Sequence, residues 1–371
     1  MKVGIPSEVK NNEFRVAITP AGVHELVRHG HEVYVQQGAG LGSSITDAEY
    51  VAAGGAILPT ADEVWAIADL LLKVKEPIEE EYHRLRKDQT LFTYLHLAAS
   101  RPCTDALIAS GTTAIAYETV ETADRRLPLL APMSEVAGRL APQVGAYHLM
   151  RAAGGRGVLP GGVPGVAAGK AVVIGGGVSG WNATQIAVGM GFHVTLLDRD
   201  INKLKEADKV FGTKVQTVVS NSFELERACL EADLVIGAVL IPGAKAPKLV
   251  TNELVSRMKP GSVLVDIAID QGGCFEDSHP TTHAEPTFQV HNSVFYCVAN
   301  MPGAVPNTST HALTNATLPY ILELADRGWA EALRSDAALA KGLNTHDGKV
   351  VYREVAEAHG LEYTELSALL G

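Results

Sequence analysis

The stretch Ala171-Val-Val-Ile-Gly-Gly-Gly-Val-Ser-Gly180 decides the fold of this chain. It begins as a short apolar strand, continues as the glycine pattern G-x-G-x-x-G, and leads into apolar residues at helical spacing. A second apolar run covers 193–197 and ends at Asp198. A glycine-rich turn alone is common, but a strand, turn, helix and second strand ending in a carboxylate together predict a dinucleotide-binding fold.

Each glycine of this pattern has a physical reason. Gly175 permits the tight turn, Gly177 lets a pyrophosphate approach the backbone, and Gly180 lets the helix pack closely on the strand. Val178 and Ser179 begin the helix, where unpaired N–H groups and the positive end of the helix dipole favour phosphates. We therefore expect a cofactor at this turn, rather than a glycine turn without a ligand.

Asp198 predicts which dinucleotide binds. A carboxylate at the end of the second strand accepts hydrogen bonds from the ribose hydroxyls and repels a 2′-phosphate, which favours NAD over NADP. Arg199 beside it complicates this prediction, because a neighbouring arginine can hold that phosphate. The alternative for Asp198 is a solvated carboxylate at a strand end.

Outward from this stretch, apolar runs alternate with helix-length segments, which predicts an α/β fold with parallel sheets. The runs form two separate series, so we expect two α/β domains. A long helix is predicted over 308–325, and the rest of the tail is predicted to be helical. Of the arrangements open to the tail, we favour folding back onto the first domain. The predicted strands cover 2–5, 31–35, 68–74, 90–95, 113–116, 171–174, 193–197, 214–219, 234–238, 263–268 and 294–298.

Composition disfavours several classes of protein. The 371 residues carry 31 Lys and Arg against 42 Asp and Glu, a net charge of −11, without a basic block. Such a chain is a poor match to nucleic acid or an anionic membrane, so we expect neither partner. Four cysteines without C-x-x-C spacing predict reduced core thiols in a cytoplasmic protein, and no metal site. The first residues lack an apolar segment, so we expect no signal peptide.

Four polar side chains follow separate predicted strands of the first half: Arg15, Lys75, His96 and Glu118. A guanidinium suits a carboxylate, a lysine polarises a carbonyl, and a histidine exchanges a proton near neutral pH. Each alone is a weak signal, since a single histidine at a strand end is more often structural, and Lys73 and Lys75 are also compatible with solvated side chains. Their convergence favours a substrate site, while the role of Glu118 stays open.

Ligands of open parallel sheets bind beyond the carboxyl ends of the strands. In the second half this rule selects 239–240, 267–270 and 298–301 as the remaining cofactor edge. Asp266 and Asp270 compete for the role of catalytic carboxylate. We favour Asp270, because it lies at the ligand edge while Asp266 falls within the predicted strand.

Six separate blocks resemble one family. The segment 4–20, with Gly-Ile-Pro-Ser-Glu and Phe-Arg-Val-Ala-Ile-Thr-Pro, looks like the amino-terminal signature of alanine dehydrogenases and of the related soluble part of proton-pumping transhydrogenases. The block 173–198 resembles the nucleotide signature of that family. Ser179, where alanine is common, and His279, where arginine is frequent, are departures. The blocks similar to alanine dehydrogenases specifically cover 70–77, 91–98, 133–139 and 265–273.

The resemblance implies reversible oxidative deamination of L-alanine to pyruvate and ammonium, with hydride transfer to NAD. It implies that Arg15 and Lys75 hold the substrate, and that His96 and Asp270 are the catalytic pair. The implied NAD contacts, beside the three glycines of the pattern, are Ser134, Val178, Ser179, Asp198, Lys203, Ser220, Val239, Leu240, Ile267, Ala268, Ile269, Asp270, Val298, Ala299, Asn300 and Met301.

The family fold implies two Rossmann-like domains. A central NAD-binding domain would cover 129–306, and a discontinuous substrate domain would cover 1–128 and 307–371, with a long connecting helix. Members of the family are homohexamers, so the resemblance implies a homohexamer here.

Three other functions share parts of this pattern. A transhydrogenase module binds NAD(H) without an amino-acid site, and Lys75, His96 and Asp270 together argue against it. A non-catalytic NAD sensor would keep the glycine turn but tolerate loss of His96. A lysine- or saccharopine-type dehydrogenase would perform the same chemistry on a longer substrate. Activity on other short 2-oxo acids and the direction used in the cell stay open.

Overall fold

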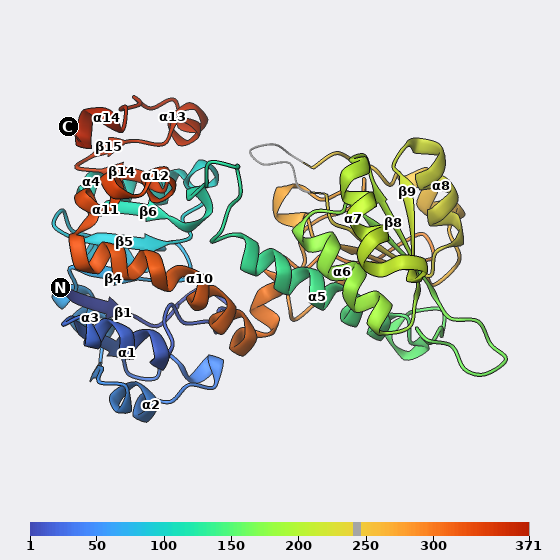
Figure 1. Cartoon of the computed structure of the whole chain (residues 1–371), viewed down its shortest axis with the longest axis horizontal. Helices are drawn as coiled ribbons and strands as arrows, with labels where there is room; N and C mark the ends of the chain where they lie inside the picture. Colours follow the sequence, from blue (N-terminus) through green and yellow to red (C-terminus); the bar gives the residue numbers. More distant parts are fainter. Residues whose placement is uncertain (240–245, 371) are drawn as a thin grey trace. The chain divides into compact units, whose positions relative to one another are not determined.

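The computed structural model describes residues 1–239 and 246–370, which divide into two compact units (Figure 1). Unit 1 holds Met1–Met133 and the chain from Val305 onward, and unit 2 holds Ser134–Ala304. Helix α5 (Ala131–His148) begins just before the first division, and α10 (Pro306–Arg327) begins just after the second. Each unit has its own sheet, in which parallel pairs dominate, so the predicted α/β fold is confirmed.

Unit 1 is built on one eight-stranded sheet. Its strands are β1 (Lys2–Ile5), β2 (Glu32–Gln36), β3 (Ala56–Leu58), β4 (Leu70–Leu72), β5 (Thr90–Thr93), β6 (Thr113–Ala116), β14 (Leu343–His346) and β15 (Lys349–Val350). The order is β15-β14-β6-β5-β4-β1-β2-β3. β1 to β6 pair with one another in parallel, so the loops that follow them lie at one edge of the sheet.

Helices join these strands. Thr19 accepts a hydrogen bond from the Gly22 N–H and Pro20 occupies the first helical position, as the Thr-Pro sequence predicts. Capping boxes begin two further helices of this unit. Apart from α10, the helices of unit 1 are α1 (Pro20–Arg28), α2 (Asp47–Ala52), α3 (Ala61–Ile67), α4 (Arg101–Ser110), α11 (Trp329–Ser335), α12 (Ala337–Ala340), α13 (Arg353–His359) and α14 (Ser367–Leu370).

The prediction of a wholly helical tail is wrong. β14 pairs antiparallel with β6 and extends the sheet, and β15 pairs antiparallel with β14. Leu343 and Thr345 of β14 are buried, although the segment has little helical or alternating apolar pattern. Short strands of this kind are determined by the neighbouring strand rather than by local periodicity. The tail does pack within unit 1, as the favoured arrangement required.

Unit 2 is built on one seven-stranded sheet in the order β12-β13-β11-β10-β7-β8-β9. All six strands predicted for the middle of the chain are present and pair in parallel, and β12 is an addition that pairs antiparallel with β13. The strands are β7 (Lys170–Ile174), β8 (His193–Asp198), β9 (Val215–Val219), β10 (Leu234–Gly237), β11 (Val263–Asp266), β12 (Thr287–Val290) and β13 (Ser293–Tyr296).

The sheet of unit 2 has helices on both faces. α6 (Val178–Gly189) and α7 (Ile201–Phe211) connect β7, β8 and β9 and pack against them. α8 (Ser222–Glu231) and α9 (Asn252–Arg257) bury Leu225 and Leu254 in a core with Val172 and Ile174 of β7. Apolar residues on both sides explain the continuous Val, Ile and Leu character of these strands.

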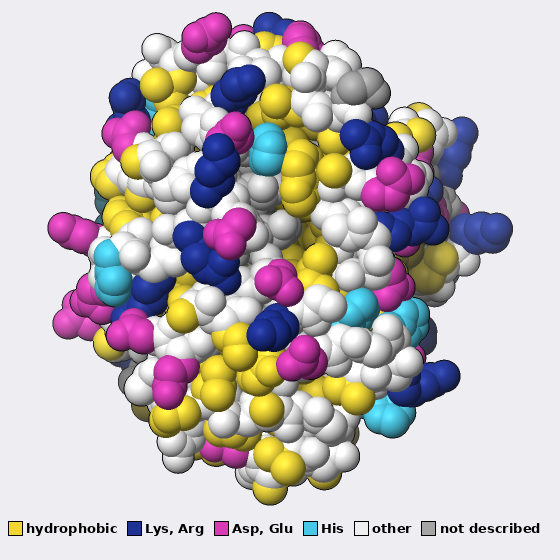
Figure 2. Space-filling view, turned by 90° about the vertical axis from the view of Figure 1, so that its left-hand side faces the viewer, with side chains coloured by type: hydrophobic (Ala, Val, Ile, Leu, Met, Phe, Trp, Pro, Cys, Tyr) yellow, Lys and Arg dark blue, Asp and Glu magenta, His cyan; other side chains and the backbone are white. Residues whose placement is uncertain are grey.

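The surface and the core agree with a globular chain of mixed charge. On the face in Figure 2, acidic and basic side chains are interspersed. All four cysteines are buried and none is in a disulfide, as expected. Within residues 1–239 and 246–370, no helix is both long and apolar enough to cross a bilayer.

Candidate active site

Most of the predicted cofactor residues of unit 2 follow the carboxyl ends of its parallel strands. The glycine turn follows β7, Asp198 ends β8, and Ser220 follows β9. Val239 follows β10, while 267–270 follow β11 and 298–301 follow β13. Because these strands are parallel, the six chain segments lie at one edge of the sheet. Leu240 lies outside the described residues.

The glycine turn has the geometry that its sequence predicts. Gly175 has a φ of +102°, a conformation that disfavours any side chain. A Cβ atom added to Gly177 would meet no atom within 4 Å, so its outer side is open. The N-cap of α6 is Gly177, which has no side chain to cap the first N–H groups of the helix. An open backbone surface beside uncapped N–H groups fits the pyrophosphate of a dinucleotide.

Gly180 is required by close packing. A Cβ atom at this position would lie 1.7 Å from the Gly175 carbonyl oxygen. We expect Gly180→Ala to displace the turn, because overpacking a tight contact costs about 1–3 kcal/mol or more. The expected result is weaker binding of a dinucleotide, measured by fluorescence titration, together with a lower melting temperature. Gly189→Ala, where an added Cβ meets no atom within 4 Å, is the matched control and should bind the dinucleotide as the parent does.

Asp198 is buried and held in place by the turn. Its Oδ2 accepts a hydrogen bond from the Gly176 N–H at 2.6 Å, and its Oδ1 accepts one from the Asp200 N–H at 2.8 Å. Lys203 Nζ lies 3.5 Å from Oδ2. Burial alone would raise the pKa of Asp198, but these hydrogen bonds and Lys203 hold that pKa below its usual range. The carboxylate is therefore ionised at neutral pH, and it is not simply a solvated strand end.

Ser134 belongs to the same edge of unit 2. It lies on α5, one turn before Gly138, and a Cβ atom added to Gly138 would lie 2.2 Å from the Ser179 carbonyl oxygen. This close approach places α5 against the first turn of α6. Gly138, one turn after Ser134, thus lies beside the helix end at which phosphates are expected.

Asp266 and Asp270 have different surroundings. Asp266 ends β11 with no exposed surface, and its carboxylate accepts hydrogen bonds from the N–H groups of Ala268, Cys274 and Phe275. Burial raises its pKa, against these hydrogen bonds. Asp270 follows in a 3-10 turn and is exposed. Asp266 therefore organises the loop, while Asp270 is the carboxylate that a ligand can reach.

In unit 1, Lys75, His96 and Glu118 lie beyond the carboxyl ends of the adjacent parallel strands β4, β5 and β6. Arg15 lies in the connection between β1 and α1. Lys75 is half-buried and its N–H donates to Glu8. Because β1 is also parallel to these strands, the loops that carry all four predicted side chains lie at one edge of the sheet.

Arg15 is held by a carboxylate that sequence reasoning missed. Its Nε and Nη2 donate to the two oxygens of Glu13 at 2.7 and 2.6 Å, and Nη1 lies 3.0 Å from Met133 Sδ. Burial alone would raise the pKa of Glu13, but Arg15 and the charge of Lys75 hold it lower. One edge of the guanidinium is therefore used inside the protein, and its orientation is fixed before any substrate carboxylate binds.

Lys73, two residues before Lys75, forms a buried ion cluster with Glu8 and Glu81. The alternative of a solvated Lys73 is therefore wrong. Its Nζ lies 2.9 Å from Glu81 and 3.2 Å from Glu8, and the lysine has no exposed surface. Burial alone would lower the pKa of Lys73, but the two carboxylates raise it. Glu8 also accepts a hydrogen bond from the Val74 N–H at 2.6 Å. The cluster fixes the backbone that carries Lys75.

The sequence does not indicate that Glu8, Glu13 and Glu81 are buried partners of cations. Glu8 and Glu13 stand among charged residues of a polar segment, and Glu81 stands among three consecutive glutamates. The one available signal was Lys73, a cation directly after an apolar strand, which requires a buried partner if its side chain points inward.

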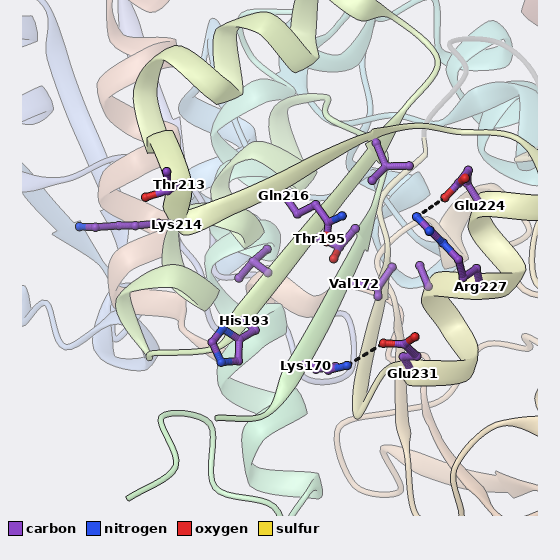
Figure 3. Close-up of a pocket in the computed structure, with 13 residues that line it drawn as sticks. Lys170, Val172, His193, Thr195, Thr213, Lys214, Gln216, Glu224, Arg227 and Glu231 are labelled. Carbon is purple, nitrogen blue, oxygen red and sulfur yellow. Dashed lines mark hydrogen bonds and ion pairs between the residues drawn. The ribbon is translucent and has the colours of Figure 1, made fainter. Parts of the chain in front are cut away.

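A cavity of about 340 Å³ lies between the sheet of unit 2 and α8 and extends to the amino ends of β7 and β8 (Figure 3). Lys170 and His193, which begin β7 and β8, line it together with α8. The ion pair of Lys170 with Glu231, at 2.6 Å, spans its rim. Since it adjoins the amino ends of parallel strands, this cavity is separate from the cofactor edge.

Comparison with known proteins identifies two family domains in the chain. Residues 4–137 match the family described as Alanine dehydrogenase/PNT, N-terminal domain, and residues 141–353 match Alanine dehydrogenase/PNT, C-terminal domain. The alanine dehydrogenases of Mycolicibacterium smegmatis and Mycobacterium tuberculosis (strain H37Rv) are 68% and 67% identical over 370 residues, with 100% of each chain covered.

Solved structures give the same result. An L-alanine dehydrogenase superposes with a TM-score of 0.95 at 51% identity, covering 97% of this chain and 99% of the other. A transhydrogenase from Sinorhizobium meliloti superposes with a TM-score of 0.84 at 26% identity, covering 95% and 100%. With both family domains matched and two thirds of its residues shared with full-length relatives, the chain belongs to the alanine dehydrogenase/PNT family.

Proposed function

We propose that this protein is an NAD-dependent L-alanine dehydrogenase, which reversibly converts L-alanine to pyruvate and ammonium. The observation that carries the proposal is that one chain contains both a glycine turn with a buried Asp198, in unit 2, and the side chains of Arg15, Lys75 and His96 at one sheet edge of unit 1. A module that only binds NAD(H) does not need an arginine that binds a substrate carboxylate, nor the lysine and histidine beside it. Near-complete coverage of alanine dehydrogenases at high identity supports the same choice.

The proposed substrate contacts follow from charge. Arg15, oriented by Glu13, binds the carboxylate shared by alanine and pyruvate. Lys75 binds the same end of the substrate and stabilises negative charge that develops on the carbonyl oxygen of pyruvate. The methyl side chain of alanine requires a small site, but one extra methylene is disfavoured by only about 1–3 kcal/mol. Some turnover of other short 2-oxo acids is therefore expected.

The proposed chemistry needs a proton shuttle. Bound NAD supplies the hydride acceptor for the alanine Cα–H. The substrate then becomes an iminium, which water attacks to form a carbinolamine, and this collapses to pyruvate and ammonium. We assign to His96 the proton transfers to and from the hydroxyl oxygen and the amino nitrogen of the carbinolamine. Asp270 orients the attacking water and stabilises the cationic intermediate through its negative charge.

The preference for NAD rests on Asp198. Asp198→Ala should weaken NAD binding by roughly 10- to 100-fold, because a hydrogen bond to a charged group contributes about 1.5–3 kcal/mol. The same change should reduce the discrimination against NADP, since the repulsion of the 2′-phosphate is lost. Asp198→Asn keeps an acceptor without the charge and should change the discrimination more than the affinity. The measurement is kcat/KM with each cofactor, and equal values for the parent protein would contradict the assignment.

We propose a homohexamer, as the family resemblance implies, and a location in the cytoplasm, as the four scattered cysteines indicate. In unit 2 the segment 155–169 exposes Leu159, Val163 and Val166 by 53% to 64%, although they are apolar. Neighbouring copies of the chain would cover the exposed apolar side chains of this segment. Sedimentation velocity should give a mass near six times the 39.3 kDa chain. A concentration-independent monomer would contradict the proposal.

A panel of substrates tests the proposed function against its rivals. Oxidation of NADH should be observed with pyruvate and ammonium together, and with neither alone. A lysine- or saccharopine-type enzyme would prefer a longer substrate by a large factor. Oxidation without ammonium would indicate a different reaction class.

A further inference from the structure

His96 adopts an uncommon backbone conformation. Its φ and ψ are 48° and 38°, in the left-handed region that only a few per cent of residues other than glycine occupy, histidine more often than most. It comes three residues after the end of β5 and begins a 3-10 turn. A residue in this conformation must be held by its surroundings.

Glu118 holds this conformation. It lies in the turn after β6, and its side chain is only 13% exposed. Its Oε1 accepts a hydrogen bond from the His96 N–H at 2.6 Å, and both carboxylate oxygens lie 3.2 Å from the Leu95 nitrogen, which donates to them. The carboxylate therefore binds the two consecutive N–H groups that set the direction of the His96 side chain.

The imidazole ring is held on two sides. Its Nδ1 lies 3.8 Å from Glu118 Oε1, an ion-pair distance that is too long for a direct hydrogen bond. The Tyr94 ring is parallel to it, with 6° between the planes and 5.9 Å between the centroids. Tyr94 is itself fixed, because its hydroxyl donates to the Leu129 carbonyl oxygen at 2.6 Å and the Tyr117 ring packs edge-on against it.

We propose that Glu118 is a positioning residue for His96. This inference rests on the proposed function. Through the two N–H groups the carboxylate holds the ring in place, and through its charge it faces Nδ1 and stabilises the imidazolium that forms when the ring takes a proton. Nε2, on the other side of the ring, is then the atom that exchanges a proton with the substrate. The step moves one proton from the substrate to Nε2 and back, and Glu118 keeps its charge throughout.

Glu118→Gln separates the charge from the hydrogen bonds. The amide oxygen can still accept from the His96 and Leu95 N–H groups, but the negative charge facing Nδ1 is lost. We expect kcat for L-alanine to fall by roughly 10- to 100-fold, less than the 10²–10⁴-fold typical of losing the acid–base group itself. The KM for L-alanine and the dissociation constant of NADH should stay within about twofold, because neither ligand contacts Glu118 in this account.

Three further variants make the test decisive. Glu118→Asp keeps the charge and should recover part of kcat, while Glu118→Ala should lose more activity than Glu118→Gln because the loop is released. Glu121→Gln is the matched control: three residues away, this carboxylate pairs with Lys341 at 2.9 Å, and its removal should leave kcat unchanged. Melting temperatures report folding.

The outcomes are distinguishable. Parental kcat in Glu118→Gln, with an active parent, would overturn the role of Glu118 and leave the proposed function intact. A parent without activity on L-alanine would overturn the proposed function, and this role with it. If Glu118→Gln does not fold, the test is the kcat of Glu118→Asp compared with that of Glu118→Ala. Equal kcat values for these two variants would overturn the role of the charge.

Discussion

His96→Ala is expected to lower kcat for L-alanine by roughly 10²–10⁴-fold while leaving NADH binding near the parental value. The imidazole is the group to which the proton transfers are assigned, and its loss leaves the carbinolamine without that acid and base. The predicted NAD contacts all belong to unit 2, so the cofactor should still bind. Stopped-flow or steady-state kinetics give kcat, and fluorescence titration gives NADH affinity.

The backbone of His96 requires a second variant. Alanine is disfavoured in the left-handed conformation, so part of the effect of His96→Ala comes from the loop. His96→Asn tolerates this conformation and also lacks an acid–base group, and it should be as inactive as His96→Ala. His24→Ala removes another histidine of unit 1 and should retain the parental rate. Near-parental turnover by His96→Asn would show that the proton shuttle has been assigned to the wrong residue.

Lys73→Met is expected to lower the free energy of unfolding by about 3–5 kcal/mol, the usual cost of leaving a buried charge without its partner. Glu8 and Glu81 would remain buried beside each other without a cation. Methionine fits a similar volume, so the effect is electrostatic rather than due to a cavity. Denaturant unfolding, monitored by circular dichroism under conditions where it is reversible, gives the difference.

Lys87→Met is the matched control for this change. The lysine pairs with Asp347 at 2.6 Å, but its side chain is 72% exposed. An exposed pair is screened by solvent, so the free energy of unfolding should change by less than about 1 kcal/mol. If Lys73→Met were as stable as Lys87→Met, the buried ion cluster of Lys73, Glu8 and Glu81 would not stabilise the fold.

Much of the fold could be predicted because its signals are local. The run 171–174 and the glycine turn are contiguous in sequence, and Asp198 follows only 18 residues after Gly180. The central strands β7, β10 and β11 are mostly apolar because helices cover both faces of the sheet. The wrongly predicted tail shows the limit of this reasoning. β14 is a strand because β6 lies beside it, and that neighbour is more than two hundred residues away in sequence.

The candidate site could be predicted only in part, for a similar reason. The carboxyl-edge rule selected Lys75, His96 and Asp270 from the positions at which strands end. The pairing of Arg15 with Glu13 depends on the conformation of a polar loop, and the hold of Glu118 on His96 depends on the register between β5 and β6. Neither has a sequence pattern. Glu118 was noted from its place after a strand, but its role required the structure.

The central claim is that this chain oxidises L-alanine with NAD, and one assay tests it most directly. Purified protein is mixed with NAD and L-alanine, NADH formation is followed by absorbance, and pyruvate is measured in the same sample. The account predicts NADH and pyruvate in equal amounts, with no signal when either reactant is omitted and a much smaller one with NADP. Absence of NADH formation from L-alanine, while the protein still binds NADH, would contradict it.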